Sequence, residues 1–180
     1  MATRARDPKK KPGSTTAAVY ATRDSDALIV VDVQNDFCPD GALAVPRGDE
    51  VVPIGTPGAA FHSDLRIPHA GLVLRKGLDR SIDSYSVLYE NDRTTPTGLT
   101  GYLRERGITR LFLAGLALDF CVRYSVEDAI REGFVVVVIE DACRGIDVQG
   151  SVAAARSSLA ALKATRITAG ELPAFLDMGN

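Results

Sequence analysis

Residues 110–134 read RLFLAGLALDFCVRYSVEDAIREGF, and this stretch decides the fold class. Its first part, 110–116, is an apolar, β-rich run typical of a buried parallel strand. The part from 122 to 132 has the apolar spacing of a helix and ends at Gly133, where helices commonly stop. The stretch therefore predicts a strand, a tight turn and a helix. This arrangement puts the Cys121 sulfur near a helix N-terminus, whose partial positive charge favours a thiolate.

Strands and helices alternate in the same way along most of the chain. Apolar, β-branched runs predict strands at ALIVVDV (27–33), LVLRK (72–76), FVVVVIED (134–141) and, more weakly, RITAG (166–170). Helical spacing predicts helices within TGLTGYLRERGIT (97–109) and SVAAARSSLAALKAT (151–165). This alternation implies an α/β protein, a three-layer α/β/α sandwich with a mainly parallel sheet.

Three chemically active residues, Asp32, Lys76 and Cys121, lie at or just beyond the C-terminal ends of predicted strands. That edge of a parallel sheet is where α/β proteins place ligands and catalytic groups. An acid, an ammonium and a thiol that meet there can perform nucleophilic chemistry, with Asp32 taking the thiol proton and Lys76 orienting the carboxylate. Taken singly, each also has a plain structural interpretation, as a turn Asp, a solvated Lys or a small buried Cys.

Length and charge limit the classes of partner. A chain of 180 residues, 46% hydrophobic, suffices for one domain, predicted over 24–180. Residues 1–23 are basic and lack apolar periodicity, so we expect a disordered tail. A net charge of -2 gives no reason to expect nucleic acid or an anionic membrane, and favours a small-molecule partner.

Membrane and redox signals point to a cytoplasmic protein. No apolar stretch approaches the length of a membrane span, and the N-terminus lacks the apolar core of a secretory signal. The three cysteines are odd in number and scattered, which favours a reducing compartment over a disulfide framework. We predict that Cys38 and Cys143 are structural.

Two distant motifs identify a family resemblance: VDVQNDF (31–37) and the G-x-A-x-D-x-C-V pattern at 115–122. With them, the chain resembles the nicotinamidase branch of the isochorismatase-like cysteine hydrolases. The matching stretches are ALIVVDVQNDFCPDGALAVPRGDEVVP (27–53), GTPGAAFHSDL (55–65), LRKGLDRSIDSYS (74–86), LAGLALDFCVRYSVEDAIREGF (113–134) and VVVVIEDACRGID (135–147). Together they span most of the chain after Ala27.

The resemblance implies an activity and a catalytic set. Nicotinamide would be hydrolysed to nicotinate and ammonia, a step of NAD salvage, through a thioester on Cys121. Asp32 and Lys76 would complete the catalytic triad. The oxyanion would be held by the backbone N–H groups of Cys121 and Ala117, since the family carries a cis peptide just before the matching alanine.

The resemblance also implies substrate contacts. Phe37 matches the aromatic residue that stacks on the pyridine ring, Tyr85 matches a wall residue, and Phe120 lies beside the nucleophile. Aromatic residues at such positions are equally often plain core. Leu118 departs from the family, which usually has a small hydroxyl residue there. Its side chain either reshapes the turn or points into the helix layer.

A defect lies between Pro53 and Ile54. The family has there a crossover helix, a strand and the Asp and two His that hold a divalent metal with the His that His62 matches. One histidine does not make a metal site, so we expect zinc, iron or manganese only if another chain or the missing segment supplies ligands. Either the deletion is real, and the sandwich lacks one strand and its crossover helix, or the sequence omits a segment.

The defect keeps other functions open. In the family, the metal holds the pyridine nitrogen, so its loss favours a metal-free relative acting on another small amide or related substrate. A second alternative is a catalytically degenerate protein that binds a ligand or partner. Apolar faces exposed by a lost strand would favour association, including a homo-oligomer. Among the remaining acids, Asp36 and Asp119 are predicted to be loop and helix-start carboxylates, with Asp119 also a candidate N-cap.

Overall fold

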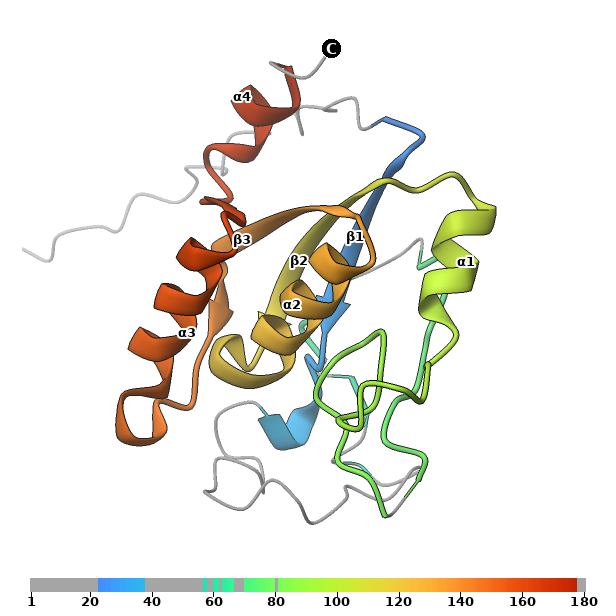
Figure 1. The fold of residues 1–180 in the computed structure, drawn as a ribbon. Coiled ribbons are helices and arrows are strands. Elements are labelled where there is room, and N and C mark those ends of the chain that lie inside the picture. The colour runs from blue at the N-terminus through green and yellow to red at the C-terminus, as the bar shows by residue number, and fades with distance from the viewer. Residues whose placement is uncertain are drawn as a thin grey trace, which may run out of the picture.

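The computed structural model describes residues 23–37, 57, 60, 61, 63–66, 70–79 and 81–177. At its centre is a parallel sheet of four strands in the order β1-β2-β3-β4 (Figure 1). The strands are β1 (Asp26–Val31), β2 (Arg110–Leu116), β3 (Val135–Arg144) and β4 (Thr165–Ile167). All four coincide with runs that the sequence predicts as strands, so the predicted parallel sheet is confirmed.

The helices complete the alternation. They are α1 (Leu99–Glu105), α2 (Arg123–Arg131), α3 (Ser151–Ala161) and α4 (Leu172–Asp177), with short helical turns η1 (Asn35–Phe37), η2 (Leu118–Val122) and η3 (Val148–Gly150). The first three helices were predicted, and Gly107 and Gly133 follow the ends of α1 and α2 as expected. α4 was not predicted.

Successive side chains of β2 point to opposite faces of the sheet, and each face is packed against a different layer of helices. Leu111 and Leu113 are completely buried in the larger core cluster, which also contains residues of α1, α2 and α3. Phe112 and Ala114 point the other way, into a smaller cluster with Leu176 of α4. α2 and α3 lie side by side over the first face of the sheet (Figure 1). Helices therefore cover both faces, and the predicted α/β/α sandwich is confirmed.

The prediction of a strand at 72–76 is wrong. Residues 72–79 have no regular secondary structure, and Leu72, Val73 and Leu74 are exposed. Strand formation depends on a neighbouring strand to pair with more than on local preference. Within the described residues, β1 is an edge strand that pairs only with β2. The run at 72–76 therefore has the composition of a strand without a sheet partner.

Exposure of β1 also differs from expectation. Its run was predicted to be buried on both faces, but Leu28 is 61% exposed. Leu28 pairs in register with Phe112, so it lies on the face that α4 covers farther along the sheet. That helix leaves Leu28 largely uncovered.

Some predictions fall on residues that the structure does not describe. These are the tail to residue 22, the junction at Pro53 and Ile54, Cys38, His62 and the side chain of Asp36. The domain limits therefore stay a prediction. Within the described part of the chain, the helices are all too short or too polar to cross a membrane.

The ion pair between Asp26 of β1 and Arg110 of β2 links the two strands. The Arg110 guanidinium donates to Asp26 through Nε (2.7 Å) and Nη2 (2.5 Å), and the Asp26 side chain is 2% exposed. We expect Asp26→Ala to lower the free energy of unfolding by about 1–3 kcal/mol, because it leaves the buried Arg110 charge unpaired. Chemical denaturation measures this change, and Asp24→Ala, at an exposed position two residues earlier, is the control.

The same pair predicts a pH dependence. The hydrogen bond from Arg110 holds the pKa of Asp26 below its ordinary value of 3.8. A depressed pKa in the folded state means that the stabilisation is complete above about pH 4 and is lost as the pH falls further. Asp26→Ala should therefore differ most from the wild type at pH 6, and the difference should shrink as the pH falls below 3.8 and through the depressed pKa. A constant difference would contradict this assignment.

Candidate active site

A close approach between β1 and β2 forms the base of the site. Gly115 pairs in register with Val31 and has φ +124°. A Cβ atom at Gly115 would lie 2.1 Å from the Val31 carbonyl oxygen, so only glycine permits this approach. Asp32 follows directly, in the left-handed region at φ +46°, and its carbonyl accepts the Gln34 N–H at 2.9 Å. Aspartate tolerates this conformation better than most residues.

The nucleophile lies in the turn after β2. Cys121 is in η2, a single turn of π-helix that runs into α2, so the predicted strand, turn and helix are confirmed. The peptide bond between Leu116 and Ala117 is cis, at the place that the family resemblance implied. The Cys121 carbonyl accepts the Ser125 hydroxyl at 2.6 Å, and the Val87 N–H donates to that hydroxyl at 3.0 Å.

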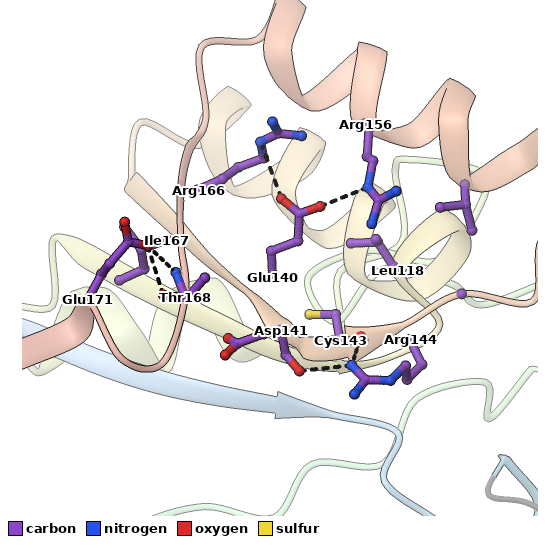
Figure 2. Close-up of a pocket in the computed structure, with 12 residues that line it drawn as sticks. Leu118, Glu140, Asp141, Cys143, Arg144, Arg156, Arg166, Ile167, Thr168 and Glu171 are labelled. Atoms are coloured by element: carbon purple, nitrogen blue, oxygen red, sulfur yellow. Dashed lines mark hydrogen bonds and ion pairs between the residues drawn. The ribbon is translucent and has the colours of Figure 1, made fainter.

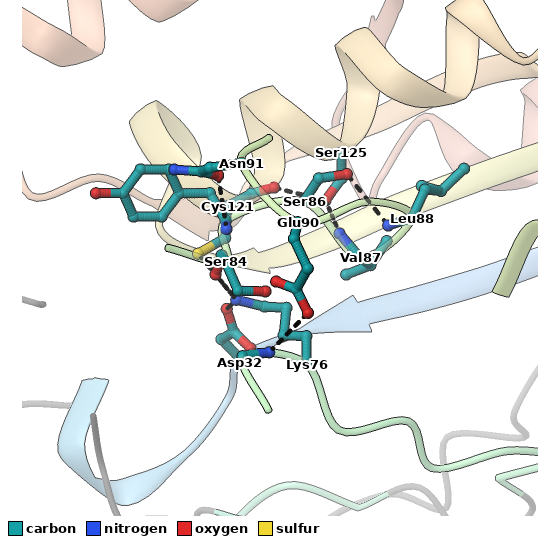
Figure 3. Close-up of polar contacts among 12 residues, drawn as sticks. Asp32, Lys76, Ser84, Ser86, Val87, Leu88, Glu90, Asn91, Cys121 and Ser125 are labelled. Atoms are coloured by element: carbon teal, nitrogen blue, oxygen red, sulfur yellow. Dashed lines mark hydrogen bonds and ion pairs between the residues drawn. The ribbon is translucent and has the colours of Figure 1, made fainter. Parts of the chain in front are cut away.

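Lys76 joins the acid to the thiol. Its Nζ lies 3.0 Å from Asp32 Oδ2 and 3.5 Å from Cys121 Sγ, and it donates to the Ser84 carbonyl at 2.7 Å (Figure 3). The side chains of Lys76 and Asp32 are 15% and 14% exposed. The three residues predicted to converge do so, although the lysine comes from an irregular segment and not from a strand end.

Burial governs the protonation of this cluster. Burial raises the pKa of the Cys121 thiol to about 12, with Lys76 lowering it and Asp32 raising it. Burial also lowers the pKa of Lys76, but the negative charges of Cys121 and Asp32 raise it more, and the net direction is upward. The positive end of the helix favours a thiolate, as the sequence indicates, but burial outweighs it and the net direction of the thiol pKa is upward. At neutral pH the site holds a thiol beside a charged ammonium, and attack requires a base.

Aromatic side chains gather beside the nucleophile. The Tyr85 ring lies 5.7 Å from the Phe120 ring and 5.2 Å from the Tyr124 ring, between centroids. Phe37 is half-buried in η1 and is not part of this cluster. Tyr124 was not predicted, although its i,i+4 spacing from Phe120 was a usable signal.

Two residues of η2 face away from the thiol. Asp119, 2% exposed, accepts hydrogen bonds from the N–H groups of Ile146 (3.1 Å) and Asp147 (2.9 Å) and from the Ser151 hydroxyl (2.5 Å). It therefore links the turn to the loop before α3. The predicted place at a helix start is confirmed, since Asp119 lies in the first turn of η2, but Asp119 is not an N-cap because no side chain caps η2 or α2. Leu118 is buried in the larger core cluster, so its bulk points into the helix layer.

A cavity of about 540 Å³, with Leu118 in its lining, lies elsewhere (Figure 2). Its lining consists of residues of β3, α3, β4 and their loops and excludes the three catalytic candidates. Its charged groups pair with one another: Glu140 lies 2.7 Å from Arg156 Nε and 3.5 Å from Arg166 Nε. Cys143, in its wall, donates its Sγ–H to the Ile139 carbonyl at 3.3 Å, and burial raises its pKa to about 11. These features are those of a structural cysteine.

The described residues can be compared with the metal site that the family resemblance implies. No group of three His, Cys, Asp or Glu side chains able to hold a metal occurs among the described residues. The described residues therefore do not form the metal site that the family resemblance implies, and His62 lies outside them.

Comparisons with known proteins show which family and which solved structures the chain resembles. The isochorismatase domain family matches residues 48–171. A nicotinamidase of Acinetobacter baylyi is 36% identical over 196 residues, covering 79% of this chain and 92% of that protein. The solved Acinetobacter baumanii nicotinamidase pyrazinamidease is 36% identical with a TM-score of 0.78, covering 84% of this chain and 100% of that one. Pyrococcus horikoshii pyrazinamidase, solved in complex with zinc, is 26% identical with a TM-score of 0.64, covering 80% and 99%.

The protonation of Cys121 can be tested by alkylation. Below its pKa the thiolate fraction rises tenfold per pH unit, so the rate with iodoacetamide should rise by about that factor per unit up to pH 10. Asp32→Asn should speed alkylation at pH 9 severalfold, because the Asp32 charge raises the thiol pKa, and Lys76→Ala should slow it. Peptide mass spectrometry measures the rate at Cys121 with Cys143 as internal reference. A plateau below pH 9 would contradict this account.

Proposed function

Because this chain belongs to the isochorismatase family, we propose that it is a cysteine-dependent amidohydrolase that converts nicotinamide and water to nicotinate and ammonia, in NAD salvage. One observation carries the proposal. The Lys76 ammonium lies within 3.0 Å of Asp32 and 3.5 Å of Cys121, in a chain that shares 36% identity with a nicotinamidase. A small amide is therefore the proposed partner, and a cytoplasmic location stays a prediction.

The first chemical step is attack of the thiol on the amide. Asp32 takes the proton from Cys121 as Sγ adds to the carboxamide carbon, which forms a C–S bond and a tetrahedral oxyanion. Transfer at the moment of attack suits a thiol whose pKa is raised by burial. Lys76 holds the Asp32 carboxylate in place and lowers the energy of the developing negative charge on sulfur.

The second step releases the products. Protonated Asp32 gives its proton to the amide nitrogen, the C–N bond breaks, and ammonia leaves a thioester on Cys121. Asp32, again a carboxylate, takes a proton from water as the water oxygen adds to the thioester carbon. The C–S bond then breaks, nicotinic acid leaves, and the proton on Asp32 returns to Cys121. The released acid passes its proton to ammonia in solution, so the products are nicotinate and ammonium. Atoms and charges balance without a redox partner.

The oxyanion of the tetrahedral intermediate and the pyridine ring of the substrate each require contacts with the protein. We assign the oxyanion to the backbone N–H groups of Ala117 and Cys121. Ala117 is the N-cap residue of η2, and Cys121 lies within η2. Tyr85 and Phe120, in contact with each other beside the thiol, are proposed as a wall for the pyridine ring. Phe37 is proposed as the stacking residue from η1.

We also propose that this chain lacks an internal segment that its relatives have. The match to the Acinetobacter baylyi enzyme extends over 196 residues, whereas 79% of these 180 residues is about 142. The difference supports a segment absent from this chain, and its expected place is the junction between Pro53 and Ile54. No step of the mechanism above depends on a metal. If zinc, iron or manganese binds, His62 is the proposed remaining ligand.

The direct test is ammonia release from nicotinamide by the purified chain. We expect turnover that Cys121→Ala abolishes, and Asp32→Asn and Lys76→Ala should each lower kcat by at least about 100-fold, because each removes the base or its charge partner. Thermal unfolding checks that the variants are folded. Cys143→Ala is the matched control, since its thiol lies in the core outside the site.

Added zinc, iron and manganese separate the remaining alternatives. Turnover that needs no metal supports the mechanism as written. Turnover only with metal assigns ligands to residues outside the described part of the chain. If nicotinamide is inert while other small amides are hydrolysed, the substrate assignment fails and a metal-free relative is established. If no small amide is hydrolysed with or without added metal, the amidohydrolase assignment fails and the degenerate binding protein remains.

A further inference from the structure

We propose that Glu90 is the positioning residue that holds Lys76 against Asp32 and Cys121; this inference rests on the function proposed above. Glu90 Oε1 accepts the Gly77 N–H at 3.3 Å, and Gly77 directly follows Lys76. Figure 3 shows the Glu90 carboxylate aimed at this backbone, next to the lysine. The role would be exerted through the lysine backbone and not through contact with substrate.

The burial of Glu90 is the first argument. The residue is 7% exposed, its Oε2 has no hydrogen-bond partner, and none of the ion pairs among the described residues includes it. A buried carboxylate without a cation is costly in free energy. An amide or an apolar residue would serve packing alone at lower cost. The acid therefore calls for an explanation other than stability.

The lysine segment supplies the second argument. Residues 70–79 have no regular secondary structure, so no strand ladder fixes the position of Lys76. At the end of the segment, Asp79 accepts hydrogen bonds from Ser81 and Ile82. The other described hydrogen bonds of the segment are the Tyr102 hydroxyl to the Gly71 carbonyl at 3.3 Å, the lysine Nζ to Ser84 and Cys121, and the Gly77 N–H to Glu90. Of these, the Glu90 contact alone holds the backbone beside the lysine.

The loop that carries Glu90 is itself well fixed. The Glu90 N–H donates to the Thr95 carbonyl at 2.9 Å, and the Glu90 carbonyl accepts the Arg93 N–H at 2.9 Å. The neighbouring Asn91 N–H donates to the Asp83 carbonyl at 2.8 Å, which closes the loop on itself. The same loop supplies the Ser84 carbonyl that accepts the Lys76 ammonium. One loop therefore holds both ends of the lysine residue.

The expected effect follows from geometry. Without the Glu90 contact, the backbone at Gly77 is released and the Lys76 ammonium is no longer held at 3.0 Å from Asp32. A displacement of about 1 Å in a catalytic site can cost on the order of 100-fold in rate. Glu90→Ala should therefore lower kcat for nicotinamide about 10- to 100-fold while KM changes less than about twofold.

Side-chain length and charge separate positioning from electrostatics. Glu90→Gln keeps the acceptor oxygen and should stay within about threefold of wild-type kcat, whereas Glu90→Asp keeps the charge but is too short and should resemble Glu90→Ala. Asp79→Ala is the matched control, because this exposed loop carboxylate also accepts a backbone N–H, from Ser81 at 2.9 Å, and should leave kcat unchanged. Equal loss in Glu90→Gln and Glu90→Ala would overturn the proposal.

A double-mutant cycle on thiol reactivity gives a second readout that needs no turnover. Lys76 lowers the thiol pKa, so Glu90→Ala and Lys76→Ala should each slow iodoacetamide alkylation of Cys121 at pH 9. In the Lys76→Ala background, Glu90→Ala should add less than about twofold, because it acts through the lysine. Independent, multiplying effects, or a lowered melting temperature with unchanged alkylation, would overturn the role. This result stands even if nicotinamide proves not to be the substrate.

Discussion

The burial of one ammonium group is the constraint on which the site depends. Lys76 is taken out of water beside a carboxylate and a thiol, and a buried charge is tolerated only when its donors are satisfied. Its Nζ reaches Asp32, Cys121 and the Ser84 carbonyl, which come from three separate parts of the chain. The lysine therefore ties the end of β1, the turn after β2 and the 83–91 loop into one unit.

That unit forms because two strands end close together. The absence of a side chain at Gly115 lets β1 approach β2, and the left-handed turn at Asp32 directs the chain out of the sheet where η2 begins. On the far side of η2, Asp119 fastens the turn to the loop before α3. Sheet geometry thus fixes the acid and the thiol, and only the lysine has to be positioned by a loop.

The sequence predicts what local pattern determines and misses what distant partners determine. The four strands, three helices and the convergence of Asp32, Lys76 and Cys121 follow from apolar periodicity and motifs. The run at 72–76 has strand composition, but a strand needs a neighbour that local sequence does not reveal. The hydrogen bonds of Asp119 were not predicted because its partners lie 27 to 32 residues onward. The protonation of Cys121 depends on burial, which is a tertiary property.

A buried, protonated thiol is compatible with a nucleophile. Oxidation and alkylation follow thiolate character and exposure, so a thiol with a pKa of about 12 is protected while the site is empty. Intrinsic nucleophilicity falls as the thiol pKa falls, so the thiolate formed here at the moment of attack is more reactive than that of a thiol with a low pKa. The catalytic demand then shifts from stabilising a resting thiolate to accepting its proton. Asp32 meets that demand only while Lys76 stays beside it, which makes the position of the lysine decisive for the rate.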